Sequence, residues 1–155
     1  MIANNYLSPT GLPLHHLVYS SSAPVELSAA TLAELLRGSR QRNEQRDITG
    51  ILLYQQLQFL QVLEGPEAAV RAIYRRIARD QRHYSLTVLS DGPIARRLFA
   101  DWSMGFAAPV AASFSFSSVT GYLDPAHLPP PTPTTPDAGL LGLIYEFIQT
   151  TEVFF

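Results

Sequence analysis

The stretch Ile48-Thr49-Gly50-Ile51-Leu52-Leu53-Tyr54-Gln55-Gln56-Leu57-Gln58-Phe59-Leu60-Gln61-Val62-Leu63 decides the fold. Two apolar runs, 48–54 and 58–63, lie close enough together to predict a β-hairpin. In the second run, alternation places Gln61 on the same face as Phe59 and Leu63, so an amide points into an apolar layer. A buried amide without partners costs roughly 1–3 kcal/mol. The hairpin therefore predicts a polar partner for Gln61 inside the protein.

The sequence on either side of the hairpin predicts three more strands. They span 14–20, 84–90 and 102–107, and a short helical turn is expected at 94–100. In the first of these strands Leu17 and Tyr19 share one face, which directs a second polar group, the Tyr19 phenol, inward.

Two helices are expected between the strands. Ser28 is a good N-cap for a helix that runs to about Asn43. Gly65-Pro66-Glu67 opens the second helix, with Pro66 at its first position, and its apolar stripe comprises Val70, Ile73, Tyr74 and Ile77. The order β-α-β-β-α-β with an added fifth strand predicts an α+β, ferredoxin-like sheet that carries both helices on one face.

Composition restricts the class of protein. The chain has 155 residues, of which 46% are apolar and 15% charged, with a net charge of −2 and no cysteine. These values indicate a globular protein without disulfides or thiol chemistry, and they favour neither nucleic-acid binding nor membrane binding. No apolar run is long enough to span a bilayer and no secretory signal precedes the first strand, so a cytoplasmic protein is expected.

The ends of the chain differ from its middle. Residues 1–13 are expected to form an irregular lead-in, 14–107 the folded domain, 108–136 a Pro/Ser-rich linker and 137–155 a C-terminal apolar helix. That helix is too apolar to stand in water. It is expected either to cover the sheet face that the other helices leave open or to pair with another subunit.

Tyr19, Asn43 and Gln61 form a candidate binding constellation. Each has a simpler interpretation: Tyr19 as a core tyrosine, Asn43 as a helix C-cap, and Gln61 as an amide bonded to main chain. In this topology, however, the first and third strands are neighbours. A ligand that lies between the two helices and above the sheet could contact all three side chains at once.

Five segments, in order, resemble the BLUF family of flavin-binding blue-light receptor domains. The segments are Leu17-Val18-Tyr19-Ser20-Ser21, Asn43 followed by Ile48-Thr49-Gly50-Ile51-Leu52-Leu53-Tyr54, Phe59-Leu60-Gln61-Val62-Leu63-Glu64-Gly65, Arg79-Asp80-Gln81-Arg82-His83 and Trp102-Ser103-Met104-Gly105-Phe106. The resemblance covers about 14–107 and is closest to short, stand-alone members with a C-terminal helical tail.

The resemblance implies a role for each constellation residue. Tyr19 would donate an electron and a proton to the excited flavin, Gln61 would bridge Tyr19 to the flavin, and Asn43 would hold the pyrimidine edge. Ile48, Phe59 and Ile77 would pack on the ring, and Asp80, Arg82 and His83 would lie near the ribityl and phosphate end. FAD is the expected cofactor, with FMN or riboflavin as alternatives.

Trp102 and Met104 lie two residues apart on one strand face. Core packing is their simplest role, but the resemblance implies that they relay the signal from Gln61 to the surface. A methionine thioether is flexible enough for such a role.

Two positions depart from the family pattern. Arg42 stands where the family often has Asn or His, which puts a second amide contact to the flavin in doubt, although a guanidinium could bond a carbonyl or a phosphate. The turn Gln55-Gln56-Leu57 lacks the glycine that the family commonly has there.

The remaining basic residues predict little chemistry. The arginines of the second helix (Arg71, Arg75, Arg76 and Arg79) favour a solvated face over a phosphate clamp. Arg82 with His83 is the better phosphate candidate. His15 and His16 have no acidic or Cys partners at ligand spacing, and His127 is isolated, so no metal site is expected.

The leading functional hypothesis is a light-sensing signalling module without enzymatic turnover. Its output would be a change in affinity for a separate downstream protein or for itself as a homo-oligomer. The alternatives are a non-photochemical flavin-binding or protein-interaction module and an acylphosphatase-type hydrolase. The sequence lacks the phosphate-cradling loop after the first strand that such a hydrolase needs. It also lacks the aromatic strand signature of RNA-binding sheets.

Overall fold

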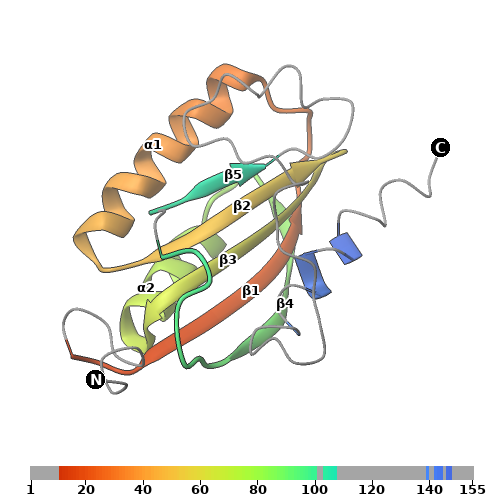
Figure 1. Cartoon of the computed structure of the whole chain (residues 1–155). Helices are drawn as coiled ribbons and strands as arrows, with labels where there is room; N and C mark the ends of the chain where they lie inside the picture. The colour runs from red at the N-terminus through yellow and green to blue at the C-terminus, as the bar shows by residue number, and fades with distance from the viewer. Residues whose placement is uncertain (1–10, 101–102, 108–138, 140–141, 145, 148–155) are drawn as a thin grey trace.

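The computed structural model describes residues 11–100, 103–107, 139, 142–144, 146 and 147. The elements follow the predicted order (Figure 1). They are β1 (Leu14–Ser22), α1 (Ala29–Gln45), β2 (Thr49–Gln55), β3 (Gln58–Pro66), α2 (Glu67–Ala78), β4 (Tyr84–Pro93) and β5 (Gly105–Ala107). The predicted α+β class and the β-α-β-β-α-β arrangement are confirmed.

The strands form one sheet in the order β4-β1-β3-β2-β5. Neighbouring strands run antiparallel except for β5, which lies parallel to β2 at the edge. The register between the central strands places Tyr19 of β1 directly opposite Gln61 of β3. Because directly opposite residues of an antiparallel pair project on the same face, the two polar side chains meet by construction.

Each sheet face has its own apolar core. Both helices pack on one face, where Leu32 and Leu36 of α1 and Val70 of α2 meet the sheet (Figure 1). Ser28 caps α1 as expected, since its Oγ accepts from Thr31 N at 3.1 Å. The other face carries a second cluster of buried side chains: Val18, Ile51, Leu53, Leu60, Val62, Phe99 and Ile144.

The start of α2 differs slightly from the expectation. Pro66 is the N-cap, with φ −59° and ψ 139°, and not the first helical residue. Its ring restricts φ but leaves ψ free, and pairing with Leu14 keeps Pro66 extended as the last residue of β3.

The prediction of a helical turn at 94–100 is wrong, because these residues form bends and irregular backbone. Glu64, fully buried at the end of β3, accepts hydrogen bonds from Leu98 N at 2.5 Å and Phe99 N at 2.9 Å. Burial raises the pKa of this carboxyl, while the two backbone bonds act in the opposite direction. A distant carboxylate thus satisfies the N–H groups that a helical turn would have bonded locally.

The fifth strand is shorter than the predicted 102–107. Strand pairing begins at Gly105, opposite Ile51, while Ser103 and Met104 form a bend. Trp102 lies outside the described residues.

The C-terminal helix is described only in part. Residues 142–144 and 146–147 have helical backbone, and Ile144 is fully buried in the second core. Gln55 Nε2 donates to Phe147 O at 2.7 Å. These residues therefore cover the open sheet face, which was one of the two expected arrangements. Residues 1–10 of the expected lead-in and the whole expected linker, 108–136, lie outside the described residues.

The turn between β2 and β3 is strained for its sequence. Gln56 and Leu57 both adopt positive φ, 48° and 66°, although neither is glycine. A two-residue hairpin loop of type I′ needs positive φ at both central residues, which costs a residue with a side chain about 1–2 kcal/mol relative to glycine. Leu57 offsets part of this cost because it packs on the core.

Gln56→Gly is therefore expected to stabilise the protein by about 1 kcal/mol. Urea denaturation followed by circular dichroism would measure the gain. The matched control is Gln58→Gly, because Gln58 is a regular strand residue that bonds Ser22 and its replacement should lower stability. A Gln56→Gly variant no more stable than the parent would show that the turn is not strained.

Candidate functional site: a cleft over the central strands

A cleft of about 540 Å³ opens between α1, the segment after α2 and the sheet. Its volume lies within the range of small-molecule and cofactor sites. The lining residues are Tyr19, Leu35, Ser39, Arg42, Leu52, Phe59, Gln61, Arg76, Ile77, Arg79, Asp80, Gln81, Arg82 and His83.

Tyr19 and Gln61 meet inside this cleft. Both are buried, and the Tyr19 hydroxyl donates a hydrogen bond to Gln61 Oε1. Burial raises the pKa of the Tyr19 phenol, and the nearby Tyr74 and Asp80 raise it further. Tyr19 is therefore a neutral phenol across the physiological range, with its proton held toward an amide oxygen.

The other end of the Gln61 amide faces a weak partner. Gln61 Nε2 lies 3.5 Å from Met104 Sδ, and Met104 is buried. A thioether sulfur is a poor hydrogen-bond acceptor compared with a carbonyl oxygen or a ring nitrogen. A ligand that offers either of those atoms would therefore compete well for this donor.

The wall of the cleft contains apolar side chains and the imidazole of His83, whose orientation is held by two hydrogen bonds. Phe59 and Ile77 supply apolar surface, and the His83 ring lies edge-on to Phe59 with centroids 6.3 Å apart. His83 Nε2 must donate to the carbonyl of Ile77 at 2.7 Å, so Nδ1 is free to accept from Ser21 Oγ at 2.8 Å.

The mouth of the cleft is positively charged. Arg42, Arg76, Arg79 and Arg82 line it, and Asp80 is the one carboxylate among the lining residues. Asp80 bonds Arg82 (Nη2 to Oδ2 2.5 Å), and these bonds lower the pKa of its carboxyl. Burial lowers the pKa of Arg42, and repulsion by Arg76 and Arg82 lowers it further. An anionic group bound here would relieve that repulsion.

Two expected site residues do not line the cleft. Asn43 is buried, and its Nδ2 donates to the carbonyl of Ser103 at 2.6 Å. The backbone carbonyl of Asn43 accepts hydrogen bonds from Arg46 N and Ile48 N. The C-cap of α1 is Arg46, so Asn43 is not the C-cap residue. Ile48 belongs to the helix-side core. Their contacts with a flavin remain predictions.

Sequence reasoning missed several lining residues. Leu35, Ser39 and Asn43 follow one another at intervals of four residues on α1, so their helical spacing from Asn43 was the available signal for Leu35 and Ser39. Arg76 and Arg79 are exposed at the end of α2, but they surround the cleft mouth instead of forming a uniform solvated face. Their positions, four residues and one residue before Asp80, were the available signal.

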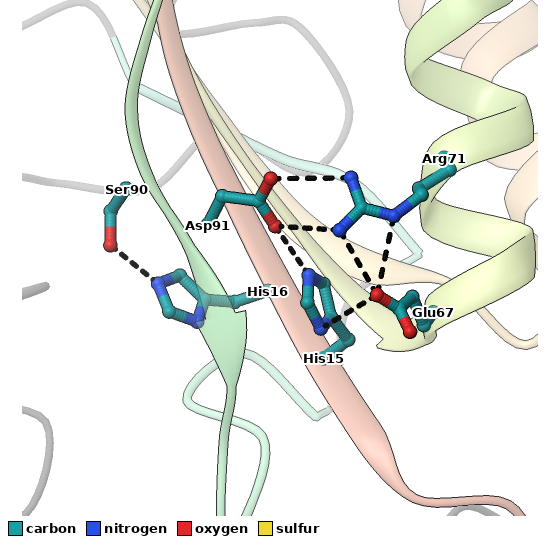
Figure 2. Close-up of polar contacts among 6 residues, drawn as sticks. All are labelled: His15, His16, Glu67, Arg71, Ser90 and Asp91. Carbon is teal, nitrogen blue, oxygen red and sulfur yellow. Dashed lines mark hydrogen bonds and ion pairs between the residues drawn. The ribbon is translucent and has the colours of Figure 1, made fainter.

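His15 has acidic partners that its sequence neighbours did not reveal (Figure 2). Its Nε2 donates to Asp91 at 2.5 Å, and Arg71 bridges Asp91 and Glu67. His16 projects differently and bonds Ser90 Oγ at 2.6 Å. None of these residues lines the cleft. Within the described part of the chain, no group of three His, Cys, Asp or Glu side chains could hold a metal ion.

The comparisons with known proteins agree with this geometry. The family model BLUF, sensors of blue light using FAD, matches residues 14–105. The chain belongs to the BLUF family. The family is one of flavin-binding sensors of blue light, and the α+β fold of this chain agrees with that membership.

Curated relatives carry the domain within much longer chains. The blue light- and temperature-regulated antirepressor BluF of Escherichia coli is 42% identical over 82 residues, which cover 52% of this chain and 20% of BluF. The photoactivated adenylate cyclase subunit beta of Euglena gracilis is 36% identical over 105 residues, or 66% of this chain and 12% of the relative. The chain therefore spans only a small part of these relatives.

A solved structure matches nearly end to end. The dark-state structure of BlrB, a BLUF protein, superposes with a TM-score of 0.62 at 28% identity and covers 88% of this chain and 96% of BlrB. Among the described residues, no helix has the length and apolar character needed to cross a membrane.

Proposed function

We propose that this BLUF chain is a blue-light photoreceptor whose switch is the hydrogen-bonded pair Tyr19 and Gln61. The observation that carries the proposal is the position of this pair. A neutral phenol donates to one end of a glutamine amide inside a cleft of cofactor size, while the other end contacts the Met104 thioether among the described residues. These residues fit a flavin, which offers ring nitrogens and carbonyls to the amide.

When bound, a flavin would supply a chromophore for blue light and an acceptor for one electron from a nearby side chain. Tyr19 is the donor in this proposal, because it is a phenol inside the cleft. Loss of an electron makes a phenol hydroxyl strongly acidic. Gln61 Oε1 already accepts this hydroxyl, so the proton leaves Tyr19 toward an atom that is in place.

Gln61 would then change which of its ends faces the ring, and return of the electron and the proton to Tyr19 would restore the redox state of both partners while the amide stays rearranged. A carboxamide has a donor end and an acceptor end, and rotation or tautomerisation exchanges them. On the Nε2 side of the amide, the rearrangement breaks the weak contact with Met104 Sδ. A new hydrogen bond to a ring carbonyl would shift the absorption slightly to the red, without movement of the chromophore.

The cationic mouth favours a flavin with phosphate groups, and FAD is the cofactor that we propose. Four guanidinium groups against one carboxylate among the lining residues leave an excess of positive charge. Riboflavin carries no phosphate and would leave it uncompensated. In addition to Arg82 and His83, Arg42 and Arg76 are placed to contribute.

Arg42→Gln combined with Arg76→Gln is expected to weaken FAD binding about tenfold and to leave riboflavin binding unchanged. Each partly exposed ion pair contributes up to about 1 kcal/mol, and riboflavin offers no charge to either arginine. Flavin-fluorescence titration of the apoprotein measures both affinities.

The matched control for this double variant is Arg75→Gln. Arg75 is exposed on α2 but does not line the cleft, so its loss should affect neither flavin. An equal loss of affinity for both flavins would show that the two arginines support the cleft itself and do not recognise the phosphates.

We propose that the signal leaves the site through Met104, the residue that Gln61 contacts, together with Trp102 in the same segment. The output would be altered affinity for a separate downstream protein, or for a second copy of the chain, in the cytoplasm and without catalytic turnover. Asn43 would steady the ring edge, and Ile48 would pack behind it.

An absorption spectrum before and after blue illumination tests the proposal. The protein should be yellow, shift slightly to the red in light and recover in the dark. A yellow protein whose spectrum does not shift would instead support a non-photochemical flavin-binding module. A colourless protein that no flavin reconstitutes would contradict both.

A further inference from the structure

Two side chains of α1 hold the backbone of the segment that carries Met104. Arg40 Nε donates to the carbonyl of Met104 at 2.8 Å, and Asn43 Nδ2 donates to the carbonyl of Ser103 at 2.6 Å. Residues three apart lie on the same face of a helix, so both donors point the same way. The bend at Ser103 and Met104 lets two successive carbonyls face α1, whereas in a regular strand they would alternate.

The sheet itself does not fix Met104. The pairing of β5 with β2 begins one residue later, at Gly105 opposite Ile51, and continues for three residues at the sheet edge. Met104 therefore lies between a short edge ladder and the two α1 side chains. Its thioether nevertheless contacts Gln61 Nε2 in the buried interior.

The hydrogen bond from Arg40 to the Met104 carbonyl is stronger than a bond between neutral groups. Its donor is a cation, and hydrogen bonds from charged groups are roughly twice as strong as neutral ones. The guanidinium is partly buried, with Nη2 enclosed, and this burial lowers the pKa of Arg40. Withdrawal of the Met104 carbonyl would leave a poorly solvated cation, so the bond resists displacement of the Met104 segment.

We infer that Arg40 is a positioning residue, which holds the Met104 thioether against Gln61 and thereby sets the lifetime of the light-induced arrangement. The lifetime part rests on the proposed function. Arg40 does not line the cleft, so it acts on the switch through Met104 and not through the flavin.

Loss of the Arg40 bond should slow dark recovery. Recovery returns Gln61 Nε2 to Met104 Sδ, and a loosely held Met104 makes that arrangement less stable. Part of the strength of this charged bond is lost to relaxation of the segment, and a remainder equal to an ordinary hydrogen bond corresponds to a change of about three- to tenfold in the recovery rate. Flavin affinity and the size of the red shift should stay the same, because Tyr19 and Gln61 are intact.

The chain offers a direct probe of Met104, because it contains only two methionines, Met1 and Met104. Labelling with [methyl-13C]methionine gives one resonance from the buried site, which Met104→Leu assigns. The Met104 methyl shift is compared in Arg40→Leu, which removes the donor, and in Arg40→Lys, which keeps the charge but removes the planar Nε donor. The matched control is Arg37→Leu, since Arg37 is exposed one turn earlier on α1.

Both Arg40 variants should move the Met104 methyl resonance in the dark protein and slow recovery, whereas Arg37→Leu should change neither. An unchanged Met104 resonance in both Arg40 variants would overturn the positioning role. A moved resonance with parent-like recovery would overturn the claim about lifetime. A parent chain that binds flavin without any red shift would overturn the proposed function and the lifetime claim together, while the methyl shifts would still decide whether Arg40 positions Met104.

Discussion

Tyr19→Phe is expected to keep the flavin bound but to abolish the red-shifted state completely. The substitution removes one oxygen atom and leaves the aromatic ring in the core, beside Tyr74 at a centroid distance of 5.6 Å. It removes both the proposed electron donor and the proton that Gln61 Oε1 accepts. The buried amide oxygen loses a partner, so stability should fall by about 1–3 kcal/mol, while the light response falls to zero.

Difference spectroscopy under blue light, on protein first shown to be yellow, measures this effect. Tyr74→Phe is the matched control, since Tyr74 neighbours Tyr19 but does not line the cleft, and it should keep the response. Gln61→Leu should lose the shift by a second route, because the group that rearranges is gone. Persistence of the full shift in Tyr19→Phe would contradict the assigned role.

Gly50→Ala should remove most of the stability of the fold. An added Cβ on Gly50 would lie 1.9 Å from the carbonyl oxygen of Val62 and 2.9 Å from its carbon. Both are backbone atoms of the paired strand β3, so no side-chain rotation can relieve the overlap. The central hairpin would have to separate, at a cost of about 4 kcal/mol or more, which is a large part of the total stability of a small domain.

Chemical denaturation followed by circular dichroism measures this loss. Gly92→Ala is the control, because a Cβ at Gly92 would meet only His16 Cε1, at 3.9 Å, which is an ordinary contact. It should unfold close to the parent midpoint. A Gly50→Ala protein within about 1 kcal/mol of the parent would show that β2 and β3 can move apart cheaply.

Local pattern was enough to predict the centre of the site. Strand alternation placed Tyr19 and Gln61 on the inner face, and the order of elements made their strands neighbours. Local pattern did not reveal the contact that Gln61 makes on its other side, because Met104 is distant in sequence and sits in a bend before its strand. The partner of Asn43, Ser103 O, was hidden for the same reason.

Long-range polar contacts account for the other differences. The local pattern at 94–100 predicted a helical turn, but none forms there. Glu64, near the end of β3, accepts hydrogen bonds from the backbone of Leu98 and Phe99 instead, and nothing in the spacing around Glu64 indicated this contact. His15 had no acidic neighbour by spacing, but it meets Asp91 on the adjacent strand. Such contacts depend on which side chains a finished sheet brings together, and no periodicity within one element encodes them.

The sequence by itself determined the order of elements, the face on which Tyr19 and Gln61 lie, and the resemblance to flavin-binding light sensors. The first two follow from residue type and spacing within each segment, and the third from five short segments that occur in order along the chain. Only the tertiary structure decided that Met104 is the second neighbour of Gln61, that Arg40 holds it, and that four arginines surround the cleft mouth. These features join residues far apart in the chain, and their positions are set by packing between helix and sheet.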